Sequence, residues 1–358
     1  MSKNLKVVLT GGGTAGHVMP HLALLPRMRE LHWDITYIGS SGIEKGLILS
    51  AGVPFVCIRS GKLRRYFSVK NFFDLFNVFW GLLQALAALV RKRPHVVFSK
   101  GGYVTVPVVL AAWILRIPVV AHESDYTPGL ATKIAARFAK RVLLTFSETS
   151  KYLAGYQTDW VGTPIRGELG RGNMERGWAL CRFSQNDPRP VILIMGGSQG
   201  AQKLNQLVSN CYSMLIKNFR IIHLTGKGKG NLDLVSNEHY KSFEFLSGEL
   251  SDIYAISNYI VARAGANSIF EFLFLKKPML LVPLEEGSRG DQVFNAKSFA
   301  EKGWAMVLRE KELSQTEFLE SLSHLRETSA QMVQAQENTA PDMRLERIVE
   351  ILSESAKG

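Results

Sequence analysis

Two glycine-rich turns, each directly after a short apolar run, are the residues of this chain best suited to chemistry. The first turn, Gly11–His17, follows Lys6–Thr10, and the second, Gly196–Ala201, follows Val191–Met195. Glycines allow positive φ and let backbone N–H groups approach a phosphate, and the N-terminus of a following helix adds partial positive charge. Two such turns predict two similar domains that face one anionic ligand.

His17 follows the first turn at a predicted helix N-terminus. A helix dipole disfavours imidazolium there and leaves a neutral ring that can accept a proton, so a general base and a purely structural histidine are both open interpretations. The spacing of Gly11, Gly13 and Gly16 also matches the G-x-G-x-x-G of dinucleotide enzymes. However, the next predicted strand ends in Tyr37–Ser41, without the acidic residue that would hold a ribose.

Apolar runs alternate with helical patterns through both halves of the chain, which predicts an α/β protein of two doubly wound, Rossmann-like domains with parallel sheets. The predicted elements of the first half are strands at 34–38, 95–98, 118–121 and 141–144, with helices at 17–31, 105–115 and 128–138. Those of the second half are strands at 191–195, 220–224, 243–246, 259–262 and 279–282, with helices at 201–217, 249–256, 266–275 and 291–302.

The domain boundary is predicted after residue 162, because Gly and Pro in Val161–Pro164 break both helices and strands. This gives domains at 1–162 and 163–341. A last helix at about 342–356 is expected to pack back on the first domain. With 358 residues and 46% hydrophobic residues, both halves are long and apolar enough for full cores.

Charge is distributed unevenly between the two halves. Residues 1–160 contain 20 Lys and Arg against 8 Asp and Glu, whereas residues 161–358 contain 23 of each kind, so the whole excess of +12 lies in the first half. The first half is therefore expected to meet an anionic surface, which leaves nucleic acid, a phosphorylated substrate or acidic lipid as candidates.

The cysteines and the start of the chain favour a reducing, cytoplasmic location. Three cysteines make no paired framework and lack metal spacing, and Met1–Asn4 leads straight into a strand, so we expect no signal peptide. No run is apolar enough to span a membrane, because the best candidate, Val69–Val90, contains five polar or charged residues.

Basic residues beside aromatics near Lys62–Leu83 are typical of a bilayer interface. The alternative is that these aromatics form the buried face of one helix. The residues expected to meet the membrane are Arg64, Arg65, Phe72, Phe76, Phe79 and Trp80.

Seven motifs agree in order and spacing with one known family. They are Gly11–His17, Ser99–Tyr103, His122–Ser124, Gly162–Arg166, Gly196–Ala201, Arg263–Ala266 with Glu271, and Asp291–Gln292 with Asn295–Ala296. Together they resemble the MurG family of peripheral membrane glycosyltransferases over nearly the whole chain. The resemblance implies a GT-B fold and inverting transfer of N-acetylglucosamine from UDP-GlcNAc to the C4 hydroxyl of lipid I, giving lipid II in peptidoglycan synthesis.

The resemblance also implies site residues. His17 would be the catalytic base, and Glu123 would orient it or hold the acceptor, unless His122 and Glu123 serve only their loop. The implied donor-binding residues are Thr14, Gly16, Arg166, Ser198, Gln199, Leu246, Arg263, Gly265, Glu271, Gln292 and Asn295. The implied acceptor-binding residues are Gly13, Thr14, Ala15, His17, Tyr103, Glu123 and Asp125.

Simpler structural interpretations remain for some of these residues. Arg166 is otherwise a surface arginine, and Gln292 and Asn295 are otherwise solvated amides behind a helix cap at Asp291. The motifs also depart from the family at Asp125 and Thr163, where many members have asparagine, and at Ser288–Gln292, which has one glutamine where some members have two. These departures leave individual acceptor and sugar contacts open.

By the same resemblance, no cofactor and no metal are expected. The expected partners are UDP-GlcNAc, undecaprenyl-linked lipid I, the anionic inner leaflet of the cell membrane and other cell-wall synthesis proteins, but not nucleic acid. The expected location is peripheral, on the cytoplasmic face of the membrane. The alternatives are a GT-B enzyme with another task, such as a diacylglycerol glycosyltransferase or a UDP-sugar epimerase, and a non-catalytic lipid-binding or nucleic-acid-binding protein.

Overall fold

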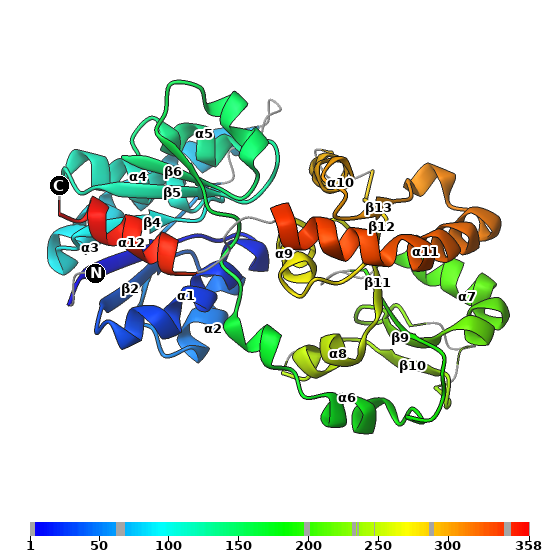
Figure 1. The fold of residues 1–358 in the computed structure, drawn as a ribbon. Coiled ribbons are helices and arrows are strands. Elements are labelled where there is room, and N and C mark those ends of the chain that lie inside the picture. The colour runs from blue at the N-terminus through cyan, green and yellow to red at the C-terminus, as the bar shows by residue number, and fades with distance from the viewer. Residues whose placement is uncertain are drawn as a thin grey trace. The chain divides into compact units, whose positions relative to one another are not determined.

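The computed structural model describes residues 4–61, 69–196, 201–230, 234, 236–246, 248–285, 290–339 and 345–357. The chain divides into two compact units (Figure 1). Unit 1 comprises Met1–Arg166 with Pro341–Gly358, and unit 2 comprises Gly167–Ala340. Each unit contains one parallel sheet with helices around it, which confirms the predicted pair of doubly wound α/β domains.

Unit 1 is built on a seven-stranded parallel sheet with the order β3-β2-β1-β4-β5-β6-β7. Its strands are β1 (Lys6–Thr10), β2 (Asp34–Gly39), β3 (Phe55–Cys57), β4 (Val96–Ser99), β5 (Val119–Glu123), β6 (Arg141–Leu144) and β7 (Thr158–Trp160). Its helices are α1 (Met19–Glu30), α2 (Ile43–Ser50), α3 (Val69–Lys92), α4 (Thr105–Ile114), α5 (Leu130–Ala136) and α12 (Leu345–Ser355), with 3-10 turns η1 (Ala15–His17) and η2 (Ser147–Leu153).

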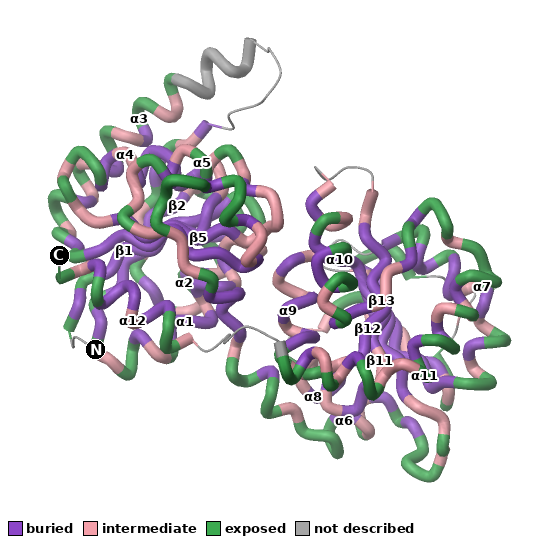
Figure 2. Tube along the Cα trace, turned by 45° about the horizontal axis from the view of Figure 1, so that its top comes forward, coloured by how far each residue is buried: buried purple, intermediate pink, exposed green. Residues whose placement is uncertain are grey.

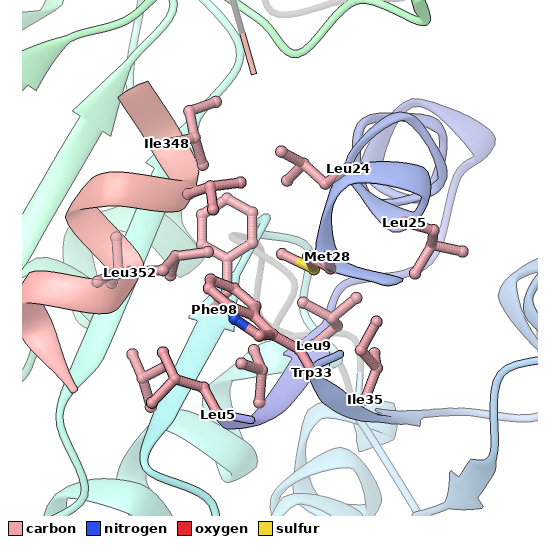
Figure 3. Close-up of a cluster of buried hydrophobic side chains, with 14 of the residues drawn as sticks. Leu5, Leu9, Leu24, Leu25, Met28, Trp33, Ile35, Phe98, Ile348 and Leu352 are labelled. Carbon is pink, nitrogen blue, oxygen red and sulfur yellow. The ribbon is translucent and has the colours of Figure 1, made fainter. Parts of the chain in front are cut away.

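The last helix, α12, belongs to the core of unit 1. Ile348 and Leu352 of α12 are buried in one cluster with Leu24 and Met28 of α1 and Phe98 of β4 (Figure 3). Apolar residues recur on one side of α12 at helical spacing, so burying that side against α1 and the sheet excludes water from both. The chain therefore completes the core of unit 1 only after it has passed through unit 2.

Unit 2 contains a six-stranded parallel sheet with the order β10-β9-β8-β11-β12-β13. Its strands are β8 (Val191–Met195), β9 (Arg220–Leu224), β10 (Tyr240–Phe243), β11 (Tyr259–Ala262), β12 (Met279–Leu281) and β13 (Met306–Val307). Its helices are α6 (Met174–Cys181), α7 (Gln202–Asn218), α8 (Leu250–Ile256), α9 (Ala266–Phe274), α10 (Asp291–Glu301) and α11 (Gln315–Thr339), with 3-10 turns η3 (Gly167–Arg171) and η4 (Glu310–Glu312). Figure 2 shows central strands of both sheets, such as β1 and β11, mostly buried.

Both sheets reverse their strand order once, and each reversal fixes where a ligand site can form. In unit 1 the order reverses between β1 and β4, and in unit 2 between β8 and β11. The loops that leave the carboxyl ends of such a strand pair separate to opposite faces of the sheet and open a crevice there. Each glycine-rich turn leaves the first strand of its pair, so the topology puts both turns at crevice-forming positions.

The predicted strand at 243–246 was wrong by three residues. The structure has β10 at Tyr240–Phe243, paired in parallel with β9 from Tyr240 opposite Ile221. Tyr240 is buried, while Phe245 is exposed and lies outside the strand. The prediction was placed around the aromatic residue at 245, because the edge strand β10 has only a half-apolar pattern.

None of the helices in the described part of the chain is long and apolar enough to cross a membrane.

Candidate active site

The first turn lies against the loop that follows β4. Gly13, Gly101 and Gly102 have φ of 85°, 84° and 86°, in the left-handed region that favours glycine. A Cβ on Gly102 would lie 2.3 Å from the carbonyl oxygen of Gly12, and one on Gly13 would lie 2.8 Å from the ring of Tyr103. The two loops therefore pack backbone to backbone.

His17 is oriented by this packing. Its Nδ1 lies 2.9 Å from the carbonyl oxygen of Gly12 and 3.2 Å from Oγ1 of Thr14. A carbonyl only accepts hydrogen bonds, so Nδ1 must carry the proton, and in the neutral ring Nε2 is then the nitrogen that carries the lone pair. This tautomer places the basic nitrogen on the side of the ring away from the turn.

Lys100 is a buried cation next to this site. Its Nζ donates to Oγ of Ser124 at 2.5 Å. Burial lowers the pKa of the Lys100 ammonium to about 7, although Glu123 and Asp125 act in the opposite direction. The lysine thus ties the end of β4 to the loop after β5.

Glu123, at the end of β5, uses its carboxylate to hold its own loop. Oε1 accepts from the backbone N–H of Ser124 at 2.8 Å and of Asp125 at 3.0 Å, and Oε2 accepts from that of Gly129 at 3.0 Å. Three charge-assisted hydrogen bonds fix the path of residues 124–129. This arrangement favours an ordering role for Glu123 over direct proton transfer.

His122 serves the turn at the end of unit 1. Its Nε2 lies 3.0 Å from the carbonyl oxygen of Gly162 and 3.1 Å from Oγ1 of Thr145. Burial and the nearby Lys100 hold its pKa well below the usual range, so the ring is neutral. His122 thereby anchors Gly162, and the chain continues through buried Thr163 to half-buried Arg166.

In unit 2 the second turn begins at Gly196, after β8, and α7 starts at Gln202. Ser198 and Gln199, both expected at the donor diphosphate, lie outside the described residues.

Arg263, at the end of β11, is turned into unit 2. Its guanidinium donates to the carbonyl oxygen of Val282 at 3.0 Å and to Oε1 of Glu310 at 2.5 Å. Burial alone would raise the pKa of the Glu310 carboxyl, but Arg263 and Lys203 lower it overall. The structure therefore shows Arg263 clamping the ends of β11 and β12 to η4.

Gly265 caps the N-terminus of α9 and leaves open space in front of it. Its φ of −68° suits any residue, and no described atom lies within 4 Å of the position that a Cβ would occupy. Glu271, one to two turns further along α9, accepts a hydrogen bond from the Tyr254 hydroxyl at 3.4 Å. An accessible helix N-terminus favours an anion.

The amides expected at the donor sugar hold the loops around this space. Asn295 is buried and donates from Nδ2 to the carbonyl oxygen of Ala264 at 3.1 Å, while Oε1 of Gln292 accepts from the backbone N–H of Leu284 at 3.0 Å. Leu246 is half-buried and follows Phe245, a residue that is 69% exposed. Gln292 and Asn295 therefore have structural partners, and their roles at the donor sugar stay predictions.

The remaining predicted residues differ in how far the structure describes them. Gly13 and Thr14 are exposed, and Gly16, Tyr103 and Asp125 are half-buried. Ala15 starts η1. Arg64 and Arg65 lie outside the described residues, as does the side chain of Phe72.

The outward face of α3 carries large apolar side chains. Phe79 is 54% exposed and Trp80 49%, and Phe76, Leu83 and Val90 are exposed as well. The opposite face buries Ala85 and Leu89 against the sheet. Trp113 and Ile114 of the neighbouring helix α4 are also exposed, so unit 1 presents aromatic and aliphatic side chains on two adjacent helices.

Sequence reasoning missed several residues that shape the site. Lys100 was visible only as part of a motif, and Glu44, Glu310 and Phe245 were not singled out. The signal for Lys100 was a charged residue at the end of an apolar strand, where parallel sheets place ligand-binding groups.

The fold and the site together define a GT-B glycosyltransferase, with two doubly wound units and a glycine-rich turn at each strand-order reversal. Residues 7–144 match the model of the glycosyltransferase family 28 N-terminal domain, and residues 191–351 match that of the family 28 C-terminal domain. The chain belongs to glycosyltransferase family 28.

Curated relatives resemble the chain over nearly its full length. A protein of Bacillus cereus named "UDP-N-acetylglucosamine--N-acetylmuramyl-(pentapeptide) pyrophosphoryl-undecaprenol N-acetylglucosamine transferase 2" is 46% identical over 352 residues, which cover 98% of this chain and 99% of the relative. A Clostridium botulinum protein with the same transferase name, without the final number, is 47% identical over 354 residues, with 98% of each chain covered.

Solved structures show the same fold. MurG of Acinetobacter baumannii superposes with a TM-score of 0.76 at 22% identity and covers 98% of this chain and 99% of its own. The glycosyltransferase of kitacinnamycin also reaches 0.76, at 14% identity and the same coverage.

Proposed function

We propose that this chain transfers N-acetylglucosamine from UDP-GlcNAc to the C4 hydroxyl of N-acetylmuramyl-pentapeptide pyrophosphoryl-undecaprenol, lipid I, and so makes lipid II. The names of the curated relatives supply both substrates. The structural observation that carries the proposal is His17, whose Nδ1 is held by the Gly12 carbonyl so that Nε2 is the basic nitrogen.

The reaction is a single displacement with inversion. Nε2 of His17 accepts the proton of the C4 hydroxyl while that oxygen bonds to the anomeric carbon of the donor sugar. The bond between the anomeric carbon and the β-phosphate oxygen breaks, and UDP leaves with the electron pair. Attack from the face opposite the leaving group inverts the anomeric configuration.

UDP leaves with negative charge that the protein must stabilise. Backbone N–H groups at the second turn and at the N-terminus of α9, together with the Arg166 cation, are the groups we assign to this task. Ser198 and Gln199 would add donors from the turn. Because amides, helix ends and an arginine meet this need, the proposed reaction requires no metal.

Donor recognition is assigned to unit 2. The Glu271 carboxylate would accept from both ribose hydroxyls, and the backbone of Leu246 would read the uracil edge. Phe245 adds an exposed ring for the flat face of the base. Gln292 and Asn295 would bind sugar hydroxyls.

Acceptor recognition is assigned to unit 1. Gly13, Thr14, Ala15 and Tyr103 would bind the acceptor beside the base, where Oγ1 of Thr14 lies 3.2 Å from Nδ1 of His17. Asp125 lies on the loop that Glu123 orders. In this arrangement Glu123 positions acceptor-binding groups.

The lipid-linked acceptor is confined to a membrane, so we also assign this chain to the cytoplasmic face of the cell membrane, as a peripheral protein. Support comes from the excess of basic residues in the first half and from the exposed apolar face of α3. Aromatic side chains insert shallowly at a bilayer interface while cations meet anionic head groups.

The first test is transfer of labelled N-acetylglucosamine from UDP-GlcNAc to a short-chain lipid I analogue in the presence of EDTA, with His17→Ala alongside. We expect transfer that survives EDTA and falls by about 10²- to 10⁴-fold in the variant, the usual effect of losing a general base. UDP binding by calorimetry should stay within about twofold of wild type, as for a group that acts only in the transition state.

Other outcomes would overturn particular parts of the proposal. Transfer unaffected by His17→Ala keeps the reaction and moves the base elsewhere. Binding of UDP-GlcNAc without transfer to the muramyl acceptor favours another GT-B task, such as glycosylation of diacylglycerol or epimerisation of the sugar. Steep salt dependence of nucleic-acid binding without UDP-GlcNAc binding would remove the enzyme assignment altogether.

A further inference from the structure

Glu44 is a buried carboxylate to which the proposed function gives no role. It is the second residue of α2, and its side chain is 0% exposed. Its carboxylate accepts from the backbone N–H of Ser40 at 3.1 Å, from the Ser40 hydroxyl, and from the backbone N–H of Gly13 at 3.4 Å. The Ser40 contacts stabilise the turn between β2 and α2, but the Gly13 contact reaches the catalytic turn, 31 residues earlier in the chain.

The carboxylate lies directly against the Gly12–Gly13 peptide. A Cβ on Gly12 would meet Oε1 of Glu44 at 2.5 Å, so only glycine admits this approach. The N–H of Gly13 and the C=O of Gly12 belong to one peptide unit and point in opposite directions when that unit is trans, as here. The N–H faces Glu44, and the C=O accepts the Nδ1–H of His17 at 2.9 Å.

A carboxylate and an imidazole therefore lie at the two ends of one peptide dipole. Hydrogen bonds in a chain polarise one another, and a negative charge at the N–H end makes the carbonyl a stronger acceptor. A stronger acceptor at Nδ1 favours the Nδ1–H tautomer and stabilises the imidazolium that forms when Nε2 takes a proton. The carboxylate of a serine-protease triad does the same for its histidine by direct contact.

We propose that Glu44 is a positioning residue for His17 and acts on it through the Gly12–Gly13 peptide. The inference rests on the proposed function only in taking His17 as the base. The neighbouring Tyr37 hydroxyl contacts a different peptide from the one that Glu44 contacts. Tyr37 donates its hydroxyl to the carbonyl of Gly11 at 2.8 Å and so holds the preceding peptide.

The other titratable groups around the turn come from four elements or their ends. They are His21 of α1, Tyr37 of β2, Lys100 and Tyr103 after β4, and Glu123 of β5. Burial holds His21 neutral, and Lys100 is hydrogen-bonded to Ser124. Burial raises the pKa of the Tyr37 hydroxyl and Glu44 raises it further, so Tyr37 is neutral whether or not Glu44 is present. A change at His17 when Glu44 is replaced therefore reports on Glu44.

The test is ¹⁵N NMR of histidine-labelled full-length protein, with His17 assigned by its loss in His17→Ala. In wild type we expect the Nδ1–H tautomer. In Glu44→Gln, which keeps the volume and one acceptor oxygen, we expect the Nε2–H form to appear and the imidazolium pKa of His17 to fall by about 0.5–1 unit, as for loss of a nearby negative charge. Transfer activity should fall about 5- to 20-fold in kcat, with the KM for UDP-GlcNAc within about twofold.

Ser40→Ala is the matched control, because it removes a partner of Glu44 in the β2–α2 turn and leaves the Gly13 contact in place. It should keep the tautomer, the titration and kcat of wild type. If Glu44→Gln folds, by circular dichroism and thermal melting, with His17 unchanged in tautomer and pKa, the inference is wrong, whatever the activity. If the His17 signals shift as expected but His17→Ala still transfers sugar, Glu44 positions His17 and the assignment of the base fails instead.

Discussion

At the scale of residues, the backbone at Gly102 constrains the position of the proposed base, His17. Its φ of 86° is unfavourable for other residues, and a Cβ would lie 2.3 Å from the Gly12 carbonyl oxygen and 3.1 Å from Nδ1 of His17. Any side chain there must push apart the two atoms that orient the imidazole. The glycine is thus needed for the geometry of another residue.

We predict that Gly102→Ala lowers kcat about 10- to 100-fold, because a displacement of His17 by an ångström misaligns proton transfer. UDP binding, assigned to unit 2 and Arg166, should not change. The control is Gly46→Ala in α2, where no atom lies within 4 Å of the new methyl group and helix propensity favours alanine. Steady-state kinetics with calorimetry of UDP binding checks both, and equal kcat values in the two variants would contradict the argument.

His21 gives a second residue-scale prediction, this time on stability. Its ring packs edge-on against Tyr37 and Phe98, and burial, with Lys100 and His17, lowers its pKa from 6.5 to about 3. Between these values the unfolded chain binds a proton that the folded chain does not. Stability is therefore lost as pH falls from about 6.5 towards 3, by up to about 1.4 kcal/mol per pH unit from this group.

His21→Phe keeps the aromatic packing and removes the proton, so its free energy of unfolding should depend less steeply on pH below 6.5. The replacement of exposed His32 by Gln should leave the wild-type slope. Urea unfolding of the three proteins between pH 4.5 and 7 measures this difference, and parallel curves for wild type and His21→Phe would count against a buried neutral histidine.

At the scale of elements, the aromatic side chains on the outward face of α3 are not needed to hold the helix on unit 1. Phe79 and Trp80 contact each other edge to face with centroids 6.3 Å apart, and each is about half-exposed. The helix is held by its other face, through residues such as Ala85 and Leu89. Replacing the exposed rings should therefore leave unit 1 folded.

We predict that Phe79→Ser with Trp80→Ser weakens binding to vesicles containing phosphatidylglycerol by at least about tenfold, since two rings lose their insertion into the interface. Transfer to a water-soluble lipid I analogue should be unchanged. Met214→Ser, which removes an exposed apolar side chain from α7 of unit 2, is the control. Co-sedimentation with vesicles distinguishes the cases, and undiminished binding of the double variant would move the membrane contact elsewhere.

Elements also show how far the sequence determined the predictions. Central strands such as β8 are continuous apolar runs buried on both faces, so Val191–Met195 was recognisable at once. The edge strands β3, β7 and β13, of two to three residues, carry too few side chains for any pattern and were not predicted.

In the candidate site, too, some features could be predicted from the sequence and others could not. Motifs within a few residues, such as the turn before His17, were visible in the sequence. The partnership of Arg263 with Glu310 spans 47 residues, and that of Glu44 with the N–H of Gly13 depends on a backbone atom that has no sequence signature. Long-range and backbone contacts of this kind are set by tertiary packing, and sequence spacing does not encode them.

At the scale of the whole molecule, unit 2 is one continuous segment between two parts of unit 1. Its core cluster draws only on residues of its own, from Ile192 to Met332. We predict that residues 166–340, which keep the Arg166 cation assigned to UDP, fold when made alone and bind UDP within about tenfold of the full chain, as expected for a domain with its own core. Glu271→Ala in that fragment should abolish binding measured by calorimetry, and a folded fragment without affinity for UDP would show that the nucleotide needs residues of unit 1.

The return of α12 to unit 1 also sets an order of events during synthesis on the ribosome. The buried side chains of Ile348 and Leu352 reach the core of the first sheet only after all of residues 167–340 have been translated. Domains usually fold in the order in which they emerge. In this chain unit 2, although it is translated later, is complete first. Unit 1 stays incomplete, with the apolar side of α1 uncovered, until α12 has been translated.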